Sequence, residues 1–247
     1  MKRLCLTGAA ALAVWPALAS GALVSAVTEI SPSGTFDGTG GDVVNVVSLT
    51  VGGYVITDLV GPPDENHVEL VGSFDSTRAR KLPAVPARST LVGINMGYAC
   101  LGLAVNAPGE AMRAYFASPV PADGTDRPEL FVLEWARGTD TFDVELLTNG
   151  PGETVTVAAV VRVNATDYTQ TTTIINTTLS GSGQYQPVSG VGINLDQAGV
   201  TGIRGMQIRS DTNSGVDTCT FLAVPEPLTA MLLGLGLPLL VRRHGKV

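Results

Sequence analysis

Residues 142–163 read FDVELLTNGPGETVTVAAVVRV, and this stretch decides the fold class. Apolar and polar residues alternate from Phe142 to Leu146, and again from Thr154 to Val157. Neighbouring side chains of a strand point to opposite faces, so an alternation of period two puts the apolar residues on one face. Between the two lies Asn149-Gly150-Pro151-Gly152, a sequence that favours a turn. The stretch therefore predicts two strands separated by a turn.

The rest of the chain extends this pattern in both directions. The expected strands cover Asp42–Val51, Tyr54–Val60, His67–Phe74, Thr90–Ile94, Ala111–Phe116, Leu130–Trp135, Phe142–Leu147, Thr154–Val163, Thr169–Leu179, Val188–Leu195, Gly202–Ser210 and Thr218–Val224. Each is bounded by Gly, Pro, Asn or Asp, and no segment between residues 27 and 224 has a sustained helical period. Residues 27–223 are therefore expected to form an all-β domain, a two-sheet sandwich that is jelly-roll-like.

The first 26 residues resemble a secretory signal peptide in composition. Lys2 and Arg3 give a positive start, an apolar run covers Leu4–Leu18, and small residues follow. Cleavage after Ala19 and cleavage after Ala26 both satisfy the requirement for small residues. A transmembrane anchor is the alternative, but the run is shorter than the roughly 20 residues that a helix needs to span a bilayer.

Residues 224–247 combine three parts in order. These are the motif Pro225-Glu226-Pro227, an apolar run over 228–241, and a basic tip with Arg242, Arg243 and Lys246. An apolar run followed by basic residues inserts into a membrane with its basic end on the cytoplasmic side. The segment closely resembles the PEP-CTERM sorting signal of exosortase-processed bacterial proteins. A buried or interfacial hydrophobic tail is the alternative interpretation.

The resemblance implies a Gram-negative-type envelope, cleavage near residues 225–227, and delivery to the outer cell surface or an extracellular polysaccharide matrix. Two partners are implied, the export translocon and an exosortase, with transient inner-membrane retention through 228–241. Residues 91–224 are also similar to the β-sandwich region of many PEP-CTERM surface proteins. The matching stretches are FASPV at 116–120, PELFVLE at 128–134, DTF at 140–142, VGINL at 191–195 and GIRGMQI at 202–208. Such domains carry no agreed catalytic residues.

The net charge of the predicted domain limits the kinds of partner that it can bind. Five of the 15 basic residues lie in residues 1–26 and 228–247, and all 22 acidic residues lie between these two stretches, so residues 27–227 carry a net charge of −12. An acidic surface repels anionic polymers. We therefore expect no nucleic-acid partner, and an acidic polysaccharide would need bridging cations.

Cysteine usage agrees with export. Cys5 lies in the signal peptide, which leaves Cys100 and Cys219 as a pair in an oxidising compartment, where disulfides form. The two are therefore a disulfide candidate. A bond between them would close a loop of roughly 120 residues, which the chain-entropy model values at about 4–5 kcal/mol.

Few residues suggest a ligand site. Trp135 beside Glu134 could stack on and hydrogen-bond a sugar, although a core position explains Trp135 equally well. Asp37 and Asp42 flank a Gly-rich loop whose oxygens a calcium ion would accept, although an ordinary turn is the alternative.

These observations predict an exported, exosortase-sorted envelope or extracellular-matrix protein with a structural or adhesive role and no catalytic residues. No cofactor is expected apart from the calcium ion that Asp37 and Asp42 could hold. A carbohydrate-binding module of the exopolysaccharide matrix is the alternative function, and a glycan hydrolase is a more remote one. Retention on exopolysaccharide would distinguish the first alternative, and turnover of a glycan the second.

Overall fold

The computed structural model describes residues 22–32, 46–63, 65–72, 80–81, 100–101, 103–105, 111–135, 141–176, 185–209 and 216–225. The strands are β1 (Val24–Pro32), β2 (Val46–Val51), β3 (Tyr54–Ile56), β4 (Val68–Val71), β5 (Arg80–Lys81), β6 (Cys100–Leu101), β7 (Leu103–Val105), β8 (Ala111–Pro121), β9 (Leu130–Trp135), β10 (Phe142–Leu147), β11 (Val157–Val163), β12 (Thr169–Asn176), β13 (Tyr185–Ile193), β14 (Gly202–Arg209) and β15 (Val216–Ala223). Two 3-10 turns, η1 (Glu65–His67) and η2 (Ala165–Asp167), are the only helical elements in these ranges. Within them, no helix has the length and apolar character needed to cross a membrane.

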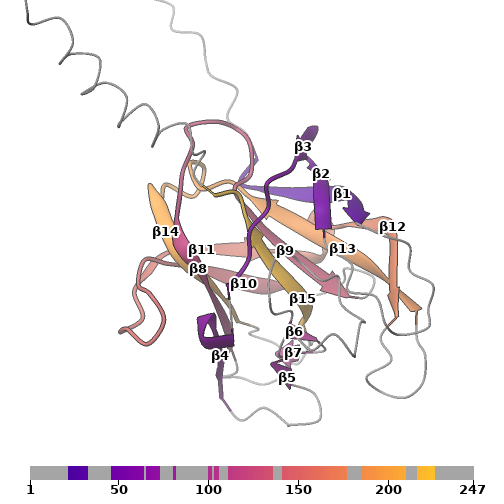
Figure 1. The fold of residues 1–247 in the computed structure, drawn as a ribbon. Coiled ribbons are helices and arrows are strands. Elements are labelled where there is room, and N and C mark those ends of the chain that lie inside the picture. Colours follow the sequence, from indigo (N-terminus) through magenta and orange to yellow (C-terminus); the bar gives the residue numbers. More distant parts are fainter. Residues whose placement is uncertain are drawn as a thin grey trace, which may run out of the picture.

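Two antiparallel sheets hold nearly all of the strands. The larger has eight strands in the order β3-β2-β1-β13-β9-β15-β7, with β12 also paired to β13, and the smaller has five in the order β11-β10-β14-β8-β4. The chain crosses between the two sheets after β3, β7, β8, β9, β11, β13 and β14 (Figure 1). Repeated crossing of this kind is typical of jelly-roll sandwiches. The expected all-β, two-sheet sandwich is confirmed.

The core lies between the two sheets. A single cluster of buried apolar side chains takes members from both. Phe131 and Phe221 come from the larger sheet, Phe142 and Met112 from the smaller, and each is at most 1% exposed. Removing such side chains from water stabilises the fold by about 25 cal/mol per Å² of apolar surface. This burial explains why apolar and polar residues alternate in the sequence of β10. The apolar residues of β10 face the core, whereas Asp143 and Glu145 stay partly exposed.

The strand predictions succeed best where the pattern is regular. β9 and β10 begin and end at the predicted residues. β8 begins at the predicted Ala111 but continues past Phe116 to Pro121, and the expected strand at Thr90–Ile94 lies outside the described residues.

β1 is the element that the sequence failed to predict. It starts at Val24, within the predicted signal peptide, and pairs with β13 through Val24, Ser25 and Ala26. Its register with β2 shifts between Val27 and Glu29, a β-bulge. The bulge breaks the period of two, so the buried residues Val27 and Ile30 are three positions apart and give no alternating signal.

The two sheets end in edge strands that expose apolar side chains. β3 exposes Tyr54 and Val55 at the edge of the larger sheet, and β11 exposes Val160 at the edge of the smaller. Arg162 on β11 forms an ion pair of 2.9 Å with Asp143. A charged side chain on an edge strand disfavours pairing with another chain.

A row of polar side chains crosses the smaller sheet on the face away from the core. Its members are directly opposed in the strand register, Glu69 on β4 to Arg113 on β8, Arg113 to Gln207 on β14, and Gln207 to Glu145 on β10. Arg113 donates a hydrogen bond to Gln207 and another of 3.0 Å to Glu69, and Gln207 donates to Glu145. Gln207 is only 1% exposed, so its bonds are shielded from water. Arg113 is therefore the central link of four strands.

Replacing Arg113 tests this row. Arg113→Met keeps the aliphatic stem but removes both donated bonds and leaves the buried Gln207 oxygen without that donor. We expect the free energy of unfolding to fall by about 1–3 kcal/mol, the cost of an unsatisfied buried polar group. Urea unfolding of the full chain, followed by circular dichroism, measures the change.

Arg209→Met is the matched control. The Nε of Arg209 lies 3.5 Å from the Oε1 of Glu145, and the Arg209 side chain is 52% exposed. Exposed ion pairs contribute about 0–1 kcal/mol, so this change is expected to cost less. Equal losses of unfolding free energy from the two substitutions would show that Arg113 stabilises the fold no more than an exposed ion-pair residue does.

Candidate functional site

Two loops meet at one end of the sandwich and form the most elaborate polar site among the residues that the structure places. Residues 122–129 join β8 to β9, and residues 194–201 join β13 to β14. The Ala122 amide donates to the Thr201 carbonyl at 3.1 Å, which aligns the two loops where they leave the smaller sheet.

The first loop is held by the carboxylate of Asp123. One of its oxygens accepts the Thr125 amide at 2.9 Å as well as the Thr125 hydroxyl, and the other pairs with Arg127 at 3.0 Å. Aspartate favours turns because its side chain can bond the backbone two residues on. Gly124 has a φ of +74°, a conformation that side-chain-bearing residues rarely adopt. The Asp123-Gly124 pair therefore sets the turn.

Asn194 joins the second loop to the first. It is fully buried, its side-chain oxygen accepts the Gln197 amide at 2.8 Å, and its side-chain nitrogen donates to the carbonyls of Thr125 and Arg127 at 2.9 and 3.3 Å. A buried amide that satisfies partners on both loops fixes their relative position.

Glu129 lies at the centre of the junction and is only 2% exposed. Its two carboxylate oxygens accept the Asp123 amide at 3.1 Å and the Leu195 amide at 2.8 Å. Its own amide donates to the Ile193 carbonyl, and its carbonyl accepts the Val224 amide at 2.8 Å. This one residue thus bonds the first loop, the second loop and the residue that follows β15.

Burial raises the pKa of Glu129 from the usual 4.5 to about 7. The two backbone donors lower this pKa, while the negative charges of Asp123 and Asp196 raise it further. Desolvation is the largest contribution because the carboxylate loses its water and gains no cationic partner. Near neutral pH the residue is therefore divided between its charged and neutral forms.

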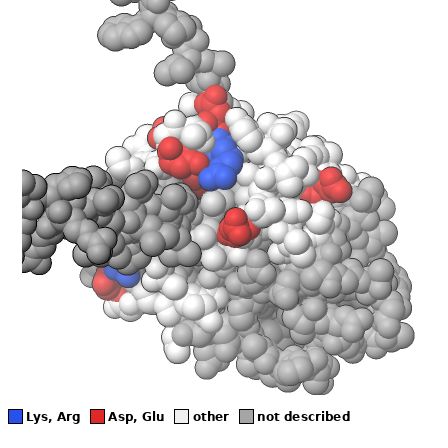
Figure 2. Space-filling model, turned by 45° about the horizontal axis from the view of Figure 1, so that its top comes forward, with Lys and Arg blue, Asp and Glu red and all other residues white. Residues whose placement is uncertain are grey.

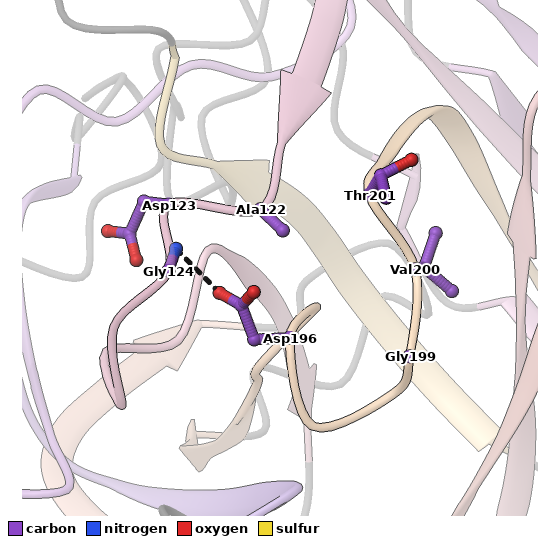
Figure 3. Close-up of a pocket in the computed structure, with 7 residues that line it drawn as sticks. All are labelled: Ala122, Asp123, Gly124, Asp196, Gly199, Val200 and Thr201. Carbon is purple, nitrogen blue, oxygen red and sulfur yellow. Dashed lines mark hydrogen bonds between the residues drawn. The ribbon is translucent and has the colours of Figure 1, made fainter.

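A pocket of about 520 Å³ opens between the loops. It is lined by Ala122, Asp123, Gly124, Asp196, Gly199, Val200 and Thr201 (Figure 3). The Asp196 carboxylate accepts the Gly124 amide at 2.7 Å across it. We call this the acidic pocket.

The acidic pocket and the neighbouring Glu129 together have the residue types that a hard cation prefers. Asp123, Glu129 and Asp196 each place one oxygen within 4.8 Å of the others, and calcium binds carboxylate oxygens. The same side chains already accept hydrogen bonds from loop amides. Those bonds account for their positions without an ion.

The sequence did not single out this site. Asp123-Gly124 reads only as a turn, Glu129 is one carboxylate among many, and Asp196 follows 73 positions after Asp123. The available signal was a pair of Asp-containing loops that also hold Gly124 and Gly199. This signal becomes informative only in the folded structure, where the β8–β9 and β13–β14 connections bring the two loops together.

Among the residues predicted as ligand candidates, Glu134 is the one whose side chain the structure describes. Glu134 is on β9 and is fully buried, so it presents no surface to a soluble glycan. Trp135 ends β9, and its side chain lies outside the described part of the chain, as do Asp37 and Asp42. The calcium loop at Asp37 and Asp42 stays a prediction.

The structure covers the sorting motif only at its first residue. Pro225 lies two residues after the end of β15 and is partly buried, whereas Glu226, Pro227 and the basic tip fall outside the described ranges. Cys100 is on β6 and Cys219 on β15, with neither side chain described. Leu103, three residues after Cys100, pairs with Thr218, the residue before Cys219. The two backbone segments are thus neighbours, and the disulfide stays a prediction.

No family model, no curated protein and no solved structure matches this chain.

The raised pKa of Glu129 predicts how stability depends on pH. The folded protein holds the proton up to about pH 7, whereas the unfolded chain releases it near pH 4.5. The contribution of Glu129 to the free energy of unfolding is therefore fully present below pH 4.5 and is lost as the pH rises to about 7. At about 1.4 kcal/mol per pKa unit, the loss is on the order of 3 kcal/mol. Urea unfolding between pH 4 and roughly 8 measures it.

Glu129→Gln removes the titrating proton, so its stability is expected to change less over this interval than that of the native chain. Asp126→Asn is the matched control, because it removes an exposed carboxylate from the same loop and should keep the native slope. A Glu129→Gln profile parallel to the native one would exclude Glu129 as the source.

Proposed function

We propose that the chain is an exported envelope or extracellular-matrix protein, sorted and processed by an exosortase, with a structural or adhesive role. One observation carries the proposal. The described sandwich begins at Val24 and its last strand ends at Ala223, so the folded unit fits between the two apolar end segments. A domain bounded in this way can keep its fold when both segments are removed.

The acidic pocket is consistent with a structural role. The carboxylates of Asp196 and of the neighbouring Glu129 accept hydrogen bonds from backbone amides of the same two loops, and the side-chain oxygen of Asn194 accepts the Gln197 amide. Bonds of this kind fix loop geometry. The resemblance to PEP-CTERM surface proteins, which assigns no catalytic residues, points in the same direction.

The position of β1 favours one of the two signal cleavage sites. Cleavage after Ala26 would remove Val24, Ser25 and Ala26, all three of which pair with β13. Cleavage after Ala19 leaves β1 whole. We therefore propose Ser20 as the first residue of the mature protein.

Intact mass spectrometry of the protein from surface and culture-supernatant fractions of its native host tests these steps. The expected mass begins at Ser20, ends near residues 225–227, and lacks two hydrogens that reduction restores if Cys100 and Cys219 are joined. A mass that begins at Val27 would refute the proposed signal cleavage site. A chain that keeps residues 228–247 in the inner membrane would refute processing.

Glu226→Ala makes the test specific to the motif. This variant is expected to keep its C-terminal segment, because the motif marks the processing region. Glu29→Ala is the control, since Glu29 is an exposed glutamate on β1, far from the motif in sequence. Normal processing of the Glu226→Ala variant would remove Glu226 from the proposed recognition motif.

A further inference from the structure

Both ends of the described chain leave the sandwich at the same place. Four adjacent strands of the larger sheet, β1, β13, β9 and β15, are aligned there, with Val24 opposite Ile193, Ile193 opposite Leu130, and Leu130 opposite Ala223. The start of β1 and the end of β15 accordingly lie at one end of the sheet (Figure 1). Neighbouring strands are about 4.8 Å apart, so three spacings separate the two exits by about 14 Å.

Hydrogen bonds fix both exits to the loops of the acidic pocket. The Asn194 amide donates to the Leu23 carbonyl at 3.1 Å, and the Val224 amide donates to the Glu129 carbonyl at 2.8 Å. Asn194 belongs to the second loop, and Glu129 ends the first. The two loops and the two chain exits therefore form one surface, which we call the exit face.

Little chain separates the exit face from the two apolar segments. Three residues, 225–227, lie between Val224 and the apolar run at 228–241, and an extended chain covers at most about 3.5 Å per residue, so the reach is roughly 10 Å. Residues 19–23 separate the first apolar run from Val24, with a reach of roughly 17 Å. When residues 228–241 are in a membrane, the exit face cannot be far from its surface.

We infer that the exit face stands against the lipid bilayer in the unprocessed chain, with the loops 122–129 and 194–201 nearest to the headgroups. This inference rests on the proposed membrane retention and adds an orientation of the domain. The opposite end then points away from the membrane. Along β14, Gly202 pairs with Pro121 beside the first loop, and Arg209, seven residues further, lies about 23 Å away.

The charge of the exit face indicates which lipids it tolerates. Asp123, Asp126 and Asp196 are exposed there, and the basic residue of these loops, Arg127, is already paired with Asp123. Figure 2 brings this end forward and shows acidic side chains at several separate places, with the basic groups next to acidic ones. Such a surface is repelled by anionic headgroups and is compatible with zwitterionic ones. After processing, the described charges of the exit face give no attraction to an anionic membrane.

Lipid quenching measured at two positions tests the orientation. The full chain, with a fluorescent amino acid in place of either Gln197 or Arg209, is reconstituted into phosphatidylcholine vesicles that carry a headgroup nitroxide quencher. Both positions are exposed, Gln197 is in the second loop of the exit face, and Arg209 is at the far end of β14. We expect a large loss of emission at Gln197 and little loss at Arg209.

The possible outcomes separate the inference from the proposed function. If the chain sediments with the vesicles but the two probes are quenched equally, or Arg209 more, the orientation is wrong and membrane retention stands. If the chain does not sediment with the vesicles, retention fails and the orientation fails with it. Self-quenching between copies at Gln197, without lipid quenching, would mean that a second copy covers the exit face and would overturn the inference.

Discussion

The carboxylate of Glu129 is almost completely buried between the amides of Asp123 and Leu195. The same residue bonds the backbone on both sides of β9, to Ile193 and to Val224. The two loops and the residue that follows the last strand are therefore joined through this one residue. Because burial and not a cationic partner sets its pKa near 7, this group is the point where solution pH acts most directly on the described fold.

Strand positions could be predicted from the sequence where the apolar residues form a continuous run or alternate regularly with polar ones. β9 is a continuous apolar run ending at Glu134-Trp135, and β10 alternates, so length and period defined both. β1 was missed because its bulge changes the spacing of Val27 and Ile30, and because its first residues resemble the end of a signal peptide. The acidic pocket was missed for a different reason. Asp123 and Asp196 belong to loops that meet only because the chain crosses between sheets, and no local pattern records that crossing.

The ligand candidates show how burial changes the interpretation of a residue. Glu134 next to Trp135 has the composition of a sugar-binding pair, yet its place in the middle strands of the larger sheet removes Glu134 from solvent. The polar groups that do gather, around Glu129 and Asn194, satisfy each other and the loop backbone. In the loops 122–129 and 194–201, polar side chains define loop shape, and the proposed surface role follows from where the chain enters and leaves the fold.

The pairing of β1 with β13 also constrains the time at which the domain can fold. Val24 and Ile193 are 169 positions apart, and β15 must still arrive to complete the same sheet. Contacts between distant parts of a chain form slowly, because the entropy of closing the intervening loop is lost before the contact is gained. The larger sheet cannot close until almost the whole domain is available. A chain of this topology cannot complete its larger sheet while only its early strands have emerged, and an incompletely folded chain is what passage through an export translocon requires.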